Sequence, residues 1–257
     1  MSRKRPIPHT AMLLAAGLGT RMRPLTDSRP KALVEFAGRP LIAHQLDRLA
    51  EAGVQRVVIN GHHFLNNLKE FIDSYKGPLE LLLSEEKEAP LDSGGGVKKA
   101  RAMLGDRPIF VLNCDAFWRD GRHPLLVALA ERFDSRRMDA LWSVVPSVRA
   151  LGCDGRGDVF MDGAGRIAFL DERQVAPFVY GGVHILKPGL VDEIDKERFS
   201  LIEVWRQAAE RGRLYGLLHE GFWAHLGTPQ ALVEAERALG LEATQRTHPR
   251  GEMENAR

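Results

Sequence analysis

Short apolar runs alternate with amphipathic stretches along the first 145 residues, and this alternation limits the folds that the chain can adopt. Apolar runs typical of buried strands occupy residues 11–16, 54–60, 79–83, 108–113 and 140–145. Helical spacing of apolar residues predicts helices over residues 41–52, 64–75, 96–104 and 124–133. Strands that alternate with helices predict an α/β fold with a mainly parallel central sheet and helices on both faces.

The second half of the chain has shorter apolar runs and a glycine-rich turn over residues 152–165. The expected elements are a hairpin of 158–162 and 166–171, strands at 178–186, 214–218 and 223–226, and helices at 201–211 and 228–239, the last capped by Thr228. The pattern predicts one folded domain over residues 10–240, between a flexible segment at 1–9 and a disordered tail at 241–257.

Composition argues against several classes of function. The chain carries 36 Lys and Arg against 34 Asp and Glu, a formal charge of +2, which disfavours a dedicated nucleic-acid or membrane-surface binder. Its two cysteines, Cys114 and Cys153, cannot form a disulfide framework or a four-cysteine zinc site. No apolar run approaches the ~20 residues that cross a bilayer. We therefore expect a cytoplasmic protein that binds neither nucleic acid nor membrane.

The strongest local signal follows the first predicted strand, where the chain reads LLAAGLGTRMRP from Leu13 and continues to Lys31. Small residues let backbone N–H groups approach a phosphate chain, and Arg21 and Lys31 can add positive charge. The P-loop pattern is absent, and Met22 replaces the third glycine of the dinucleotide fingerprint. The motif therefore predicts a nucleoside triphosphate held by a different loop. The alternative is a tight turn with solvated basic residues.

Two further candidates lie near predicted strand ends. Residues 90–96 read PLDSGGG ahead of a predicted helix, where glycines can let a base or a phosphate touch the backbone. Asn113-Cys114-Asp115 ends an apolar strand, which places Asp115 where α/β sheets bind ligands. A hinge or cap for the glycines, and a turn or N-cap for Asp115, are open alternatives. Cys114 lacks the partner pattern of a nucleophile, so we expect it to be packed.

Weaker signals come from short polar pairs. Asp154 and Asp158 lie in the glycine-rich turn and can accept hydrogen bonds from sugar hydroxyls, although turn chemistry explains them equally well. His62 and His63 suggest a metal pair, but adjacent residues in a loop at a strand end rarely point the same way. We therefore expect structural roles for both histidines.

Together these segments resemble the sugar-1-phosphate nucleotidylyltransferase family over about residues 10–239. The resemblance rests on LAAGLGTRMRPLT, PKALVEFAGRPLI, LDSGGG, the strand ending NCD, and WAHLGTP before the last helix. LDSGGG, the GRGD turn at 155–158 and the short length are similar to the small branch that includes N-acetylmuramate-1-phosphate uridylyltransferases of cell-wall sugar recycling. Mannose-1-phosphate guanylyltransferases are the nearest alternative. The family implies a Rossmann-like fold with a nucleotide-binding half at 10–145 and a sugar-binding half at 146–240.

The resemblance also implies a reaction and its partners. The phosphate of a sugar 1-phosphate attacks the α-phosphate of a nucleoside triphosphate, which we expect to be UTP, and pyrophosphate leaves. Because the attacking phosphate is already nucleophilic, no general base is needed. Catalysis then consists of positioning and of charge neutralisation by cations and Mg²⁺. We expect a monomer or a homodimer.

Family positions carry over to individual residues of this chain. The implied catalytic residues are Arg21, Lys31 and Asp115. The implied nucleotide-binding residues are Ala15, Ala16, Gly17, Gly19, Thr20, Arg21, Lys31, Leu91, Asp92, Gly94 and Gly95. The implied substrate-binding residues are Asn113, Asp158, Tyr180 and Gly182.

One position departs from the family pattern. The family has a second metal aspartate in Trp-x-Asp-x-Gly-Thr, and this chain has His225 in its place. Asp115 and His225 are the implied metal ligands, for Mg²⁺ or, because imidazole suits them better, for Mn²⁺ or Co²⁺. His225 also keeps open a non-catalytic member of the family that binds a nucleotide or an NDP-sugar as a regulator.

Overall fold

The computed structural model describes residues 6–153, 155–170 and 174–241. Residues 1–5 of the predicted flexible segment and 242–257 of the predicted tail lie outside the described residues, as do Asp154 and Asp171. Within the described ranges, no helix has the length and apolar character needed to cross a membrane.

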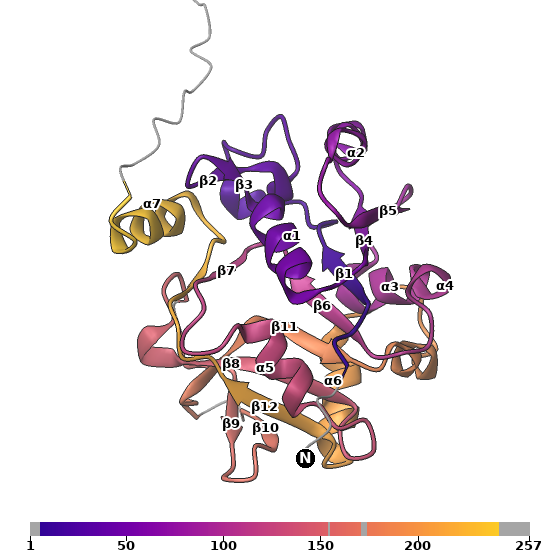
Figure 1. Ribbon diagram of the computed structural model, residues 1–257, viewed down its shortest axis with the longest axis vertical. Coiled ribbons are helices and arrows are strands. Elements are labelled where there is room, and N and C mark those ends of the chain that lie inside the picture. Colours follow the sequence, from indigo (N-terminus) through magenta and orange to yellow (C-terminus); the bar gives the residue numbers. More distant parts are fainter. Residues whose placement is uncertain (1–5, 154, 171–173, 242–257) are drawn as a thin grey trace, which may run out of the picture.

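Nine strands of the described chain form one sheet that crosses both halves of the sequence (Figure 1). They are β1 (Thr10–Leu14), β4 (Arg56–Gly61), β5 (Glu80–Glu85), β6 (Ile109–Asn113), β8 (Ala140–Pro146), β9 (Val159–Met161), β10 (Ile167–Phe169), β11 (Phe178–Leu186) and β12 (Leu214–Leu218). Strands β5-β4-β1-β6 pair in parallel, and β8 pairs in parallel with β12. Antiparallel β11 joins the two sets, and the predicted hairpin forms as β9 and β10. The predicted mainly parallel sheet is confirmed.

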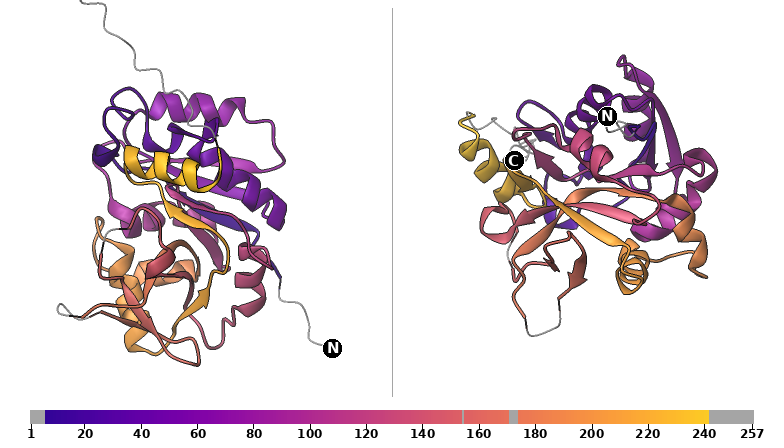
Figure 2. Two further views of the ribbon diagram at one scale, coloured as in Figure 1. Left: turned by 90° about the vertical axis from the view of Figure 1, so that its left-hand side faces the viewer. Right: turned by 60° about the horizontal axis from the view of Figure 1, so that its bottom comes forward.

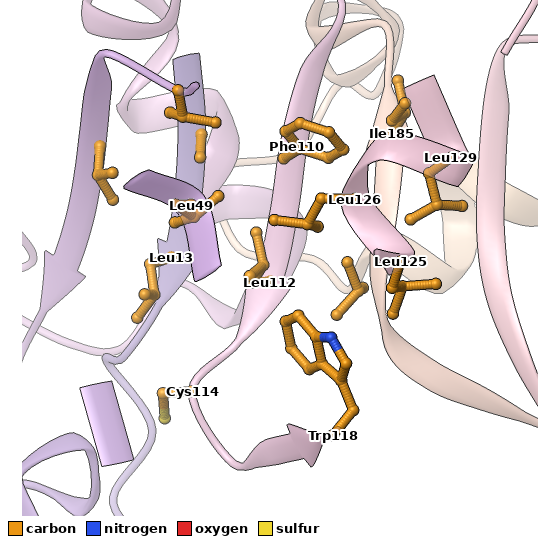
Figure 3. Close-up of a cluster of buried hydrophobic side chains, with 14 of the residues drawn as sticks. Leu13, Leu49, Phe110, Leu112, Cys114, Trp118, Leu125, Leu126, Leu129 and Ile185 are labelled. Atoms are coloured by element: carbon orange, nitrogen blue, oxygen red, sulfur yellow. The ribbon is translucent and has the colours of Figure 1, made fainter. Parts of the chain in front are cut away.

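Helices cover both faces of this sheet. They are α1 (Leu41–Ala52), α2 (Leu65–Ser74), α3 (Asp92–Lys99), α4 (Arg101–Leu104), α5 (Leu125–Arg132), α6 (Leu201–Glu210) and α7 (Pro229–Ala238). α1, α2 and α5 share one buried apolar cluster with the strands, and α3, α4 and α6 share a second. The side chains of successive strand residues point to opposite faces of the sheet, since Leu13 lies in the first cluster and Met12 in the second. Figure 3 shows the first cluster, with Leu49 of α1 and Leu126 of α5 near Leu112 of β6.

The last helix packs against segments near the start of the chain (Figure 2). α7 shares a third apolar cluster with Met22 and Phe36. The backbone N–H of Ala37 donates to Glu236, 199 residues later, at 3.2 Å. Thr228 caps α7, as predicted. The C-terminal segment is thereby fixed next to the loop that follows β1.

Two boundaries differ from the prediction for physical reasons. β1 ends at Leu14 rather than at residue 16, and Ala15 N–H donates to the side chain of Asn60 instead. The helix predicted over 96–104 begins at Asp92 and is divided at Ala100 into α3 and α4. The glycines at 94–96 therefore lie inside a helix rather than before it. They allow close packing, because a side chain at 94 or 95 would collide with residues 197–199.

Candidate active site

A cavity of about 510 Å³ lies beyond the carboxyl ends of β1, β4 and β6. This is the edge at which α/β sheets bind ligands. Of the residues predicted to bind nucleotide, eight line this first cavity: Ala15, Ala16, Gly17, Gly19, Thr20, Arg21, Lys31 and Asp92. Asn113 and Asp115 line it as well, whereas Leu91, Gly94 and Gly95 do not. The N–H groups of both glycines donate to the carbonyl of Phe199, so they are committed within the protein.

The loop after β1 depends on glycine at one position. Gly19 has a φ of +64°, and a Cβ atom there would lie 3.0 Å from Thr26 and 3.2 Å from Lys31. Thr26 Oγ1 donates to the Gly19 carbonyl at 2.9 Å, and Met22 N–H donates to the same carbonyl at 2.8 Å. These contacts fix the turn that brings Arg21 to the cavity.

At the edge of the first cavity, Asp115 lies between two basic side chains. Lys31 Nζ donates to Asp115 Oδ2 at 2.5 Å, and His225 Nε2 lies 3.1 Å from the same oxygen. The Lys31 and Asp115 side chains are only 10% and 16% exposed. The close approach arises because β13 (Trp223–His225) pairs with β7 (Ala116–Trp118), directly after Asp115. We call Lys31, Asp115 and His225 the charged cluster.

In the charged cluster, neighbouring side chains shift the pKa values of Asp115 and His225. Burial alone would raise the pKa of Asp115, but hydrogen bonds from His225 and Lys31 and the Lys31 charge lower it below its usual range. The hydrogen bond to Asp115, with a second to Cys153, raises the pKa of His225 to about 9. At neutral pH the His225 ring is therefore protonated in this arrangement, and its Nε2–H donates to the carboxylate.

A second cavity, of about 590 Å³, adjoins the first and shares Arg21 with it. The glycine-rich turn and α7 contribute Arg156, Asp158 and Glu234 to its lining. Asp158 Oδ2 accepts a hydrogen bond from Tyr180 N–H at 2.8 Å, which fixes the carboxylate. Lys31 and Asp115 line the first cavity and His225 lines the second, so the charged cluster stands at the border between the two.

Tyr180, a predicted substrate-binding residue, lines neither of these cavities. Its hydroxyl lies 2.6 Å from His184 Nδ1. Both side chains belong to a group of packed rings, partly or fully buried and here called the aromatic cluster, made of Trp142, Phe169, Tyr180, His184 and Trp205. Burial lowers the pKa of His184 to about 3. The side chain of Tyr180 is therefore partly buried and packs against the second apolar cluster.

Gly182, also predicted at the sugar pocket, lies behind the turn that carries Asp115. It has a φ of +72°, and a Cβ atom there would lie 2.5 Å from the Cβ of Ala116 and 3.6 Å from that of Asn113. A side chain at this position would displace the turn after β6. Gly182 thus supports the charged cluster through packing.

Two residues that line the first cavity, Asn60 and Arg198, were not among the sequence predictions. Asn60 ends the strand predicted over residues 54–60 and lies one residue before the end of β4, so the strand-end argument could have found it. Arg198 comes from a loop far away in sequence, and its place depends on the packing of that loop against α3.

The remaining candidates have structural surroundings. His62 Nδ1 contacts the Glu86 carbonyl at 2.6 Å, which agrees with a structural role. Cys114 is buried, and burial raises the pKa of its thiol to about 12. It lies in the first apolar cluster, so the packed role expected for it is confirmed (Figure 3).

Solved structures share this architecture. An apo UDP-glucose pyrophosphorylase matches 90% of this chain and 97% of its own, with a TM-score of 0.75 and 17% identity. The inositol-1-phosphate CTP transferase of T. maritima matches 93% and 100%, with a TM-score of 0.72 and 18% identity. At such identities the likeness concerns the fold, and it confirms the predicted Rossmann-like arrangement.

Sequence relatives extend the comparison. N-acetylmuramate alpha-1-phosphate uridylyltransferase of Caulobacter vibrioides is 42% identical over 90% of this chain and 97% of its own length. The protein of that name from Neisseria meningitidis is 31% identical over 90% and 98%. A probable mannose-1-phosphate guanylyltransferase of Oryza sativa is 32% identical over 88% of this chain but 63% of its own. The nucleotidyl transferase family model matches residues 10–241, and the chain belongs to this family.

Proposed function

We propose that this chain transfers the uridylyl group of UTP to N-acetylmuramate 1-phosphate, forming a UDP-sugar and releasing pyrophosphate. The observation that carries the proposal is the charged cluster at the border of the two cavities, with Arg21 lining both. A triphosphate bound in the first cavity and a sugar phosphate bound in the second would meet at this border. The glycine-bearing loop after β1 supports the first cavity as the nucleotide site.

The side chains at the border have distinct parts in this proposal. An oxygen of the sugar phosphate attacks the α-phosphorus, and the bond from that phosphorus to the pyrophosphate oxygen breaks. Lys31 and Arg21 neutralise the charge that develops on the transferred group. The fixed loop around Gly19 holds the reacting groups in place. His225 donates to Asp115 and keeps that carboxylate ionised and oriented.

The residues fit a divalent cation held by one protein carboxylate and by substrate phosphates. Asp115 is ionised, lies at the cavity edge and already attracts two basic groups. No group of three His, Cys, Asp or Glu side chains in the described part of the chain could hold a metal ion. This set suits Mg²⁺, which keeps several waters, and the bound ion would supply neutralisation of phosphate charge. His225 as a second ligand, favouring Mn²⁺ or Co²⁺, would first have to lose its Nε2 proton.

The second cavity supports an acidic sugar. N-acetylmuramate carries a carboxylate in addition to its 1-phosphate, and Arg21 and Arg156 offer two cations there. Asp158 can accept hydrogen bonds from sugar hydroxyls. The two relatives named for this substrate support the same choice. An enzyme of this specificity serves cell-wall sugar recycling in the cytoplasm.

A second candidate is guanylyl transfer from GTP to mannose 1-phosphate, which the relative from Oryza sativa favours. Pyrophosphate release with four nucleoside triphosphates and a panel of sugar 1-phosphates decides between the two. We expect UTP with N-acetylmuramate 1-phosphate to give the highest kcat/KM. A kcat/KM about tenfold higher for GTP with mannose 1-phosphate would replace the first candidate by the second. Tight nucleotide binding without turnover of any sugar would indicate a regulator instead.

Arg156 gives a sharper test of the sugar. Arg156→Gln should raise KM for N-acetylmuramate 1-phosphate by about tenfold, because it removes a charge-assisted contact to the carboxylate. With N-acetylglucosamine 1-phosphate, which lacks that carboxylate, KM should stay unchanged. Equal effects on the two sugars would contradict recognition of the carboxylate.

A further inference from the structure

Three hydrogen bonds, two of them buried and one partly buried, run in series along the wall of the first cavity. Ala15 N–H donates to Asn60 Oδ1 at 2.8 Å, and Asn60 Nδ2 donates to Glu86 Oε1 at 2.7 Å. The other oxygen of that carboxylate, Glu86 Oε2, accepts from Leu91 N–H at 2.7 Å. Asn60 and Glu86 are 2% and 1% exposed. The centre of the series is therefore shielded from solvent, and a hydrogen-bond donor left there without an acceptor would destabilise the fold.

The series connects two separate walls of the cavity. Ala15 begins the loop after β1, which lines the cavity on the side assigned to phosphates. Leu91 immediately precedes Asp92 and Ser93, which line it in the segment that the family resemblance implies for nucleotide binding, and a base lies there when the loop after β1 holds the phosphates. Glu86 itself does not line the cavity, so it acts on both walls through other residues.

The wall at residues 91–93 has a strained backbone that needs support. Asp92 has a φ of +64°, a conformation uncommon for residues other than glycine. Such a conformation persists only where the surrounding structure determines it. Here the bond from Leu91 to Glu86 fixes the preceding residue, and Asp92 Oδ1 accepts a hydrogen bond from Ser93 N–H at 2.5 Å.

The packing around this carboxylate leaves no room for adjustment. A Cβ atom on Gly96 would lie 2.6 Å from Asn60 Nδ2 and 2.9 Å from Glu86 Oε1. The backbone of Glu86 is held too, since its N–H donates to the Gly61 carbonyl at 2.8 Å. The carboxylate is therefore fixed by neighbours on several sides.

We propose that Glu86 is a positioning residue for nucleotide discrimination, a role that rests on the proposed function of the first cavity. By accepting from Asn60 and Leu91 together, it fixes the distance between the phosphate loop and the wall at 91–93. A base of the wrong shape is then rejected because the wall cannot move away while the triphosphate stays bound.

The direction of the hydrogen bonds permits a specific test. Both groups that face the Glu86 carboxylate are donors, so Glu86→Gln leaves one donor opposed to another donor. Turning the Asn60 amide over only moves the conflict to Ala15 N–H. Adding Asn60→Asp removes the conflict. The carboxylate introduced at position 60 accepts from Ala15 N–H and from the amide introduced at position 86. The oxygen of that amide accepts from Leu91 N–H. The double variant also keeps the net charge.

The measurement is the equilibrium Kd of UTP, CTP, GTP and ATP in the presence of Mg²⁺. Discrimination is the Kd of the second-best nucleotide divided by the Kd of the preferred one. All four carry the same triphosphate, so a carboxylate introduced near the cavity cancels in this ratio. We expect Glu86→Gln to reduce the ratio by about tenfold. Asn60→Asp with Glu86→Gln should restore it to within about threefold of the wild type. Glu236→Gln is the matched control, since Glu236 is equally buried and also accepts from a backbone N–H.

The possible outcomes separate the two proposals. An unchanged ratio in Glu86→Gln, or a double variant that recovers thermal stability but not discrimination, would overturn the role of Glu86. So would an equal loss of discrimination in Glu236→Gln, because that would reflect general loosening of the fold. A wild-type chain that binds no nucleotide would overturn the proposed function itself. Discrimination in binding without turnover of any sugar would refute the catalytic proposal and leave the role of Glu86 intact.

Discussion

The charged cluster and the aromatic cluster differ in how many of their buried polar atoms have a hydrogen-bond partner. In the charged cluster, Lys31 and His225 both reach Asp115 Oδ2. In the aromatic cluster, Trp142 Nε1, His184 Nε2 and Trp205 Nε1 have no hydrogen-bond partner among the described residues. An unpaired buried polar atom costs about 1–3 kcal/mol. Buried polar atoms are therefore paired where their positions set the chemistry, and several are left unpaired where ring packing and one hydrogen bond, between Tyr180 and His184, hold the cluster.

This difference separates two kinds of mutational effect. Substitutions in the charged cluster should act mainly on rate constants, with a smaller change in the free energy of unfolding. Substitutions in the aromatic cluster should do the reverse. The following variants test the separation, from the largest expected effect to the smallest.

Lys31→Ala should lower kcat by about 10²–10³, or about 3–4 kcal/mol, because it removes a cation from the group being transferred. KM for the triphosphate should rise far less, since the contact strengthens in the transition state. Steady-state pyrophosphate release measures both constants. Lys187→Ala is the control, because Lys187 pairs with Asp139, which lies away from both cavities. A near-normal kcat would remove Lys31 from the catalytic residues.

His184 should make the fold sensitive to acid. Its pKa is about 3 in the folded chain, against an ordinary value near 6.5, so the unfolded chain binds more protons between these values. The free energy of unfolding should therefore fall as pH drops below 6.5, by about 2–3 kcal/mol at pH 4.5. Above pH 6.5 the contribution is fully present and constant.

Denaturant unfolding of the wild type and of His184→Gln across this pH range isolates that contribution. The wild-type curve should lose stability toward acid more steeply than that of the variant, since other titrating groups cancel in the difference. Parallel curves would mean that the aromatic cluster admits a charged imidazole.

Gly227→Ala should weaken catalysis through His225. A Cβ atom at this position would lie 2.6 Å from His225 Cε1, so the ring must shift from the position in which it contacts Asp115. We expect kcat/KM to fall by about tenfold, because a small displacement at the reacting groups is costly. Gly163→Ala is the control, since no atom lies within 4 Å of a Cβ there. Unchanged kinetics would place His225 outside the machinery of the reaction.

Tyr180→Phe should have the smallest effect and should act on stability alone. Loss of the hydroxyl contact with His184 should lower the free energy of unfolding by about 0.5–1.5 kcal/mol. KM for the sugar 1-phosphate should not change, since the side chain lines neither of the two cavities. A raised KM would support the substrate contact that the family resemblance implies.

Local sequence patterns predicted the parallel sheet and most of its helices, because the spacing of apolar residues and the alternation of strands and helices along the chain determine them. The phosphate loop could also be predicted, since its glycine and cations are neighbours in sequence. The contacts of Gly94 and Gly95 with residues 197–199 could not, because no local pattern encodes the approach of a distant loop.

Side-chain direction is also hard to predict from local patterns. Tyr180 lies beside a glycine pair in a strand, where the register of β11 against β8 shifts between Tyr180 and His184. Alternation along a strand no longer predicts the face of a residue across such an irregularity. The two hydrogen bonds of Glu86 could not be predicted for a related reason, since their donors, Asn60 Nδ2 and Leu91 N–H, come within reach only in the folded chain.

The packing of α7 on Met22 and Phe36, which are synthesised long before it, has a consequence for biosynthesis. At about 5–20 residues per second, the ribosome needs roughly 10–40 s to pass from Ala37 to Glu236, 199 residues later. During that interval Met22 and Phe36 lack the helix on which they finally pack. His225 is also still missing beside Asp115. The nascent chain can thus form much of its sheet early, while the reactive centre comes together only after His225 has been synthesised.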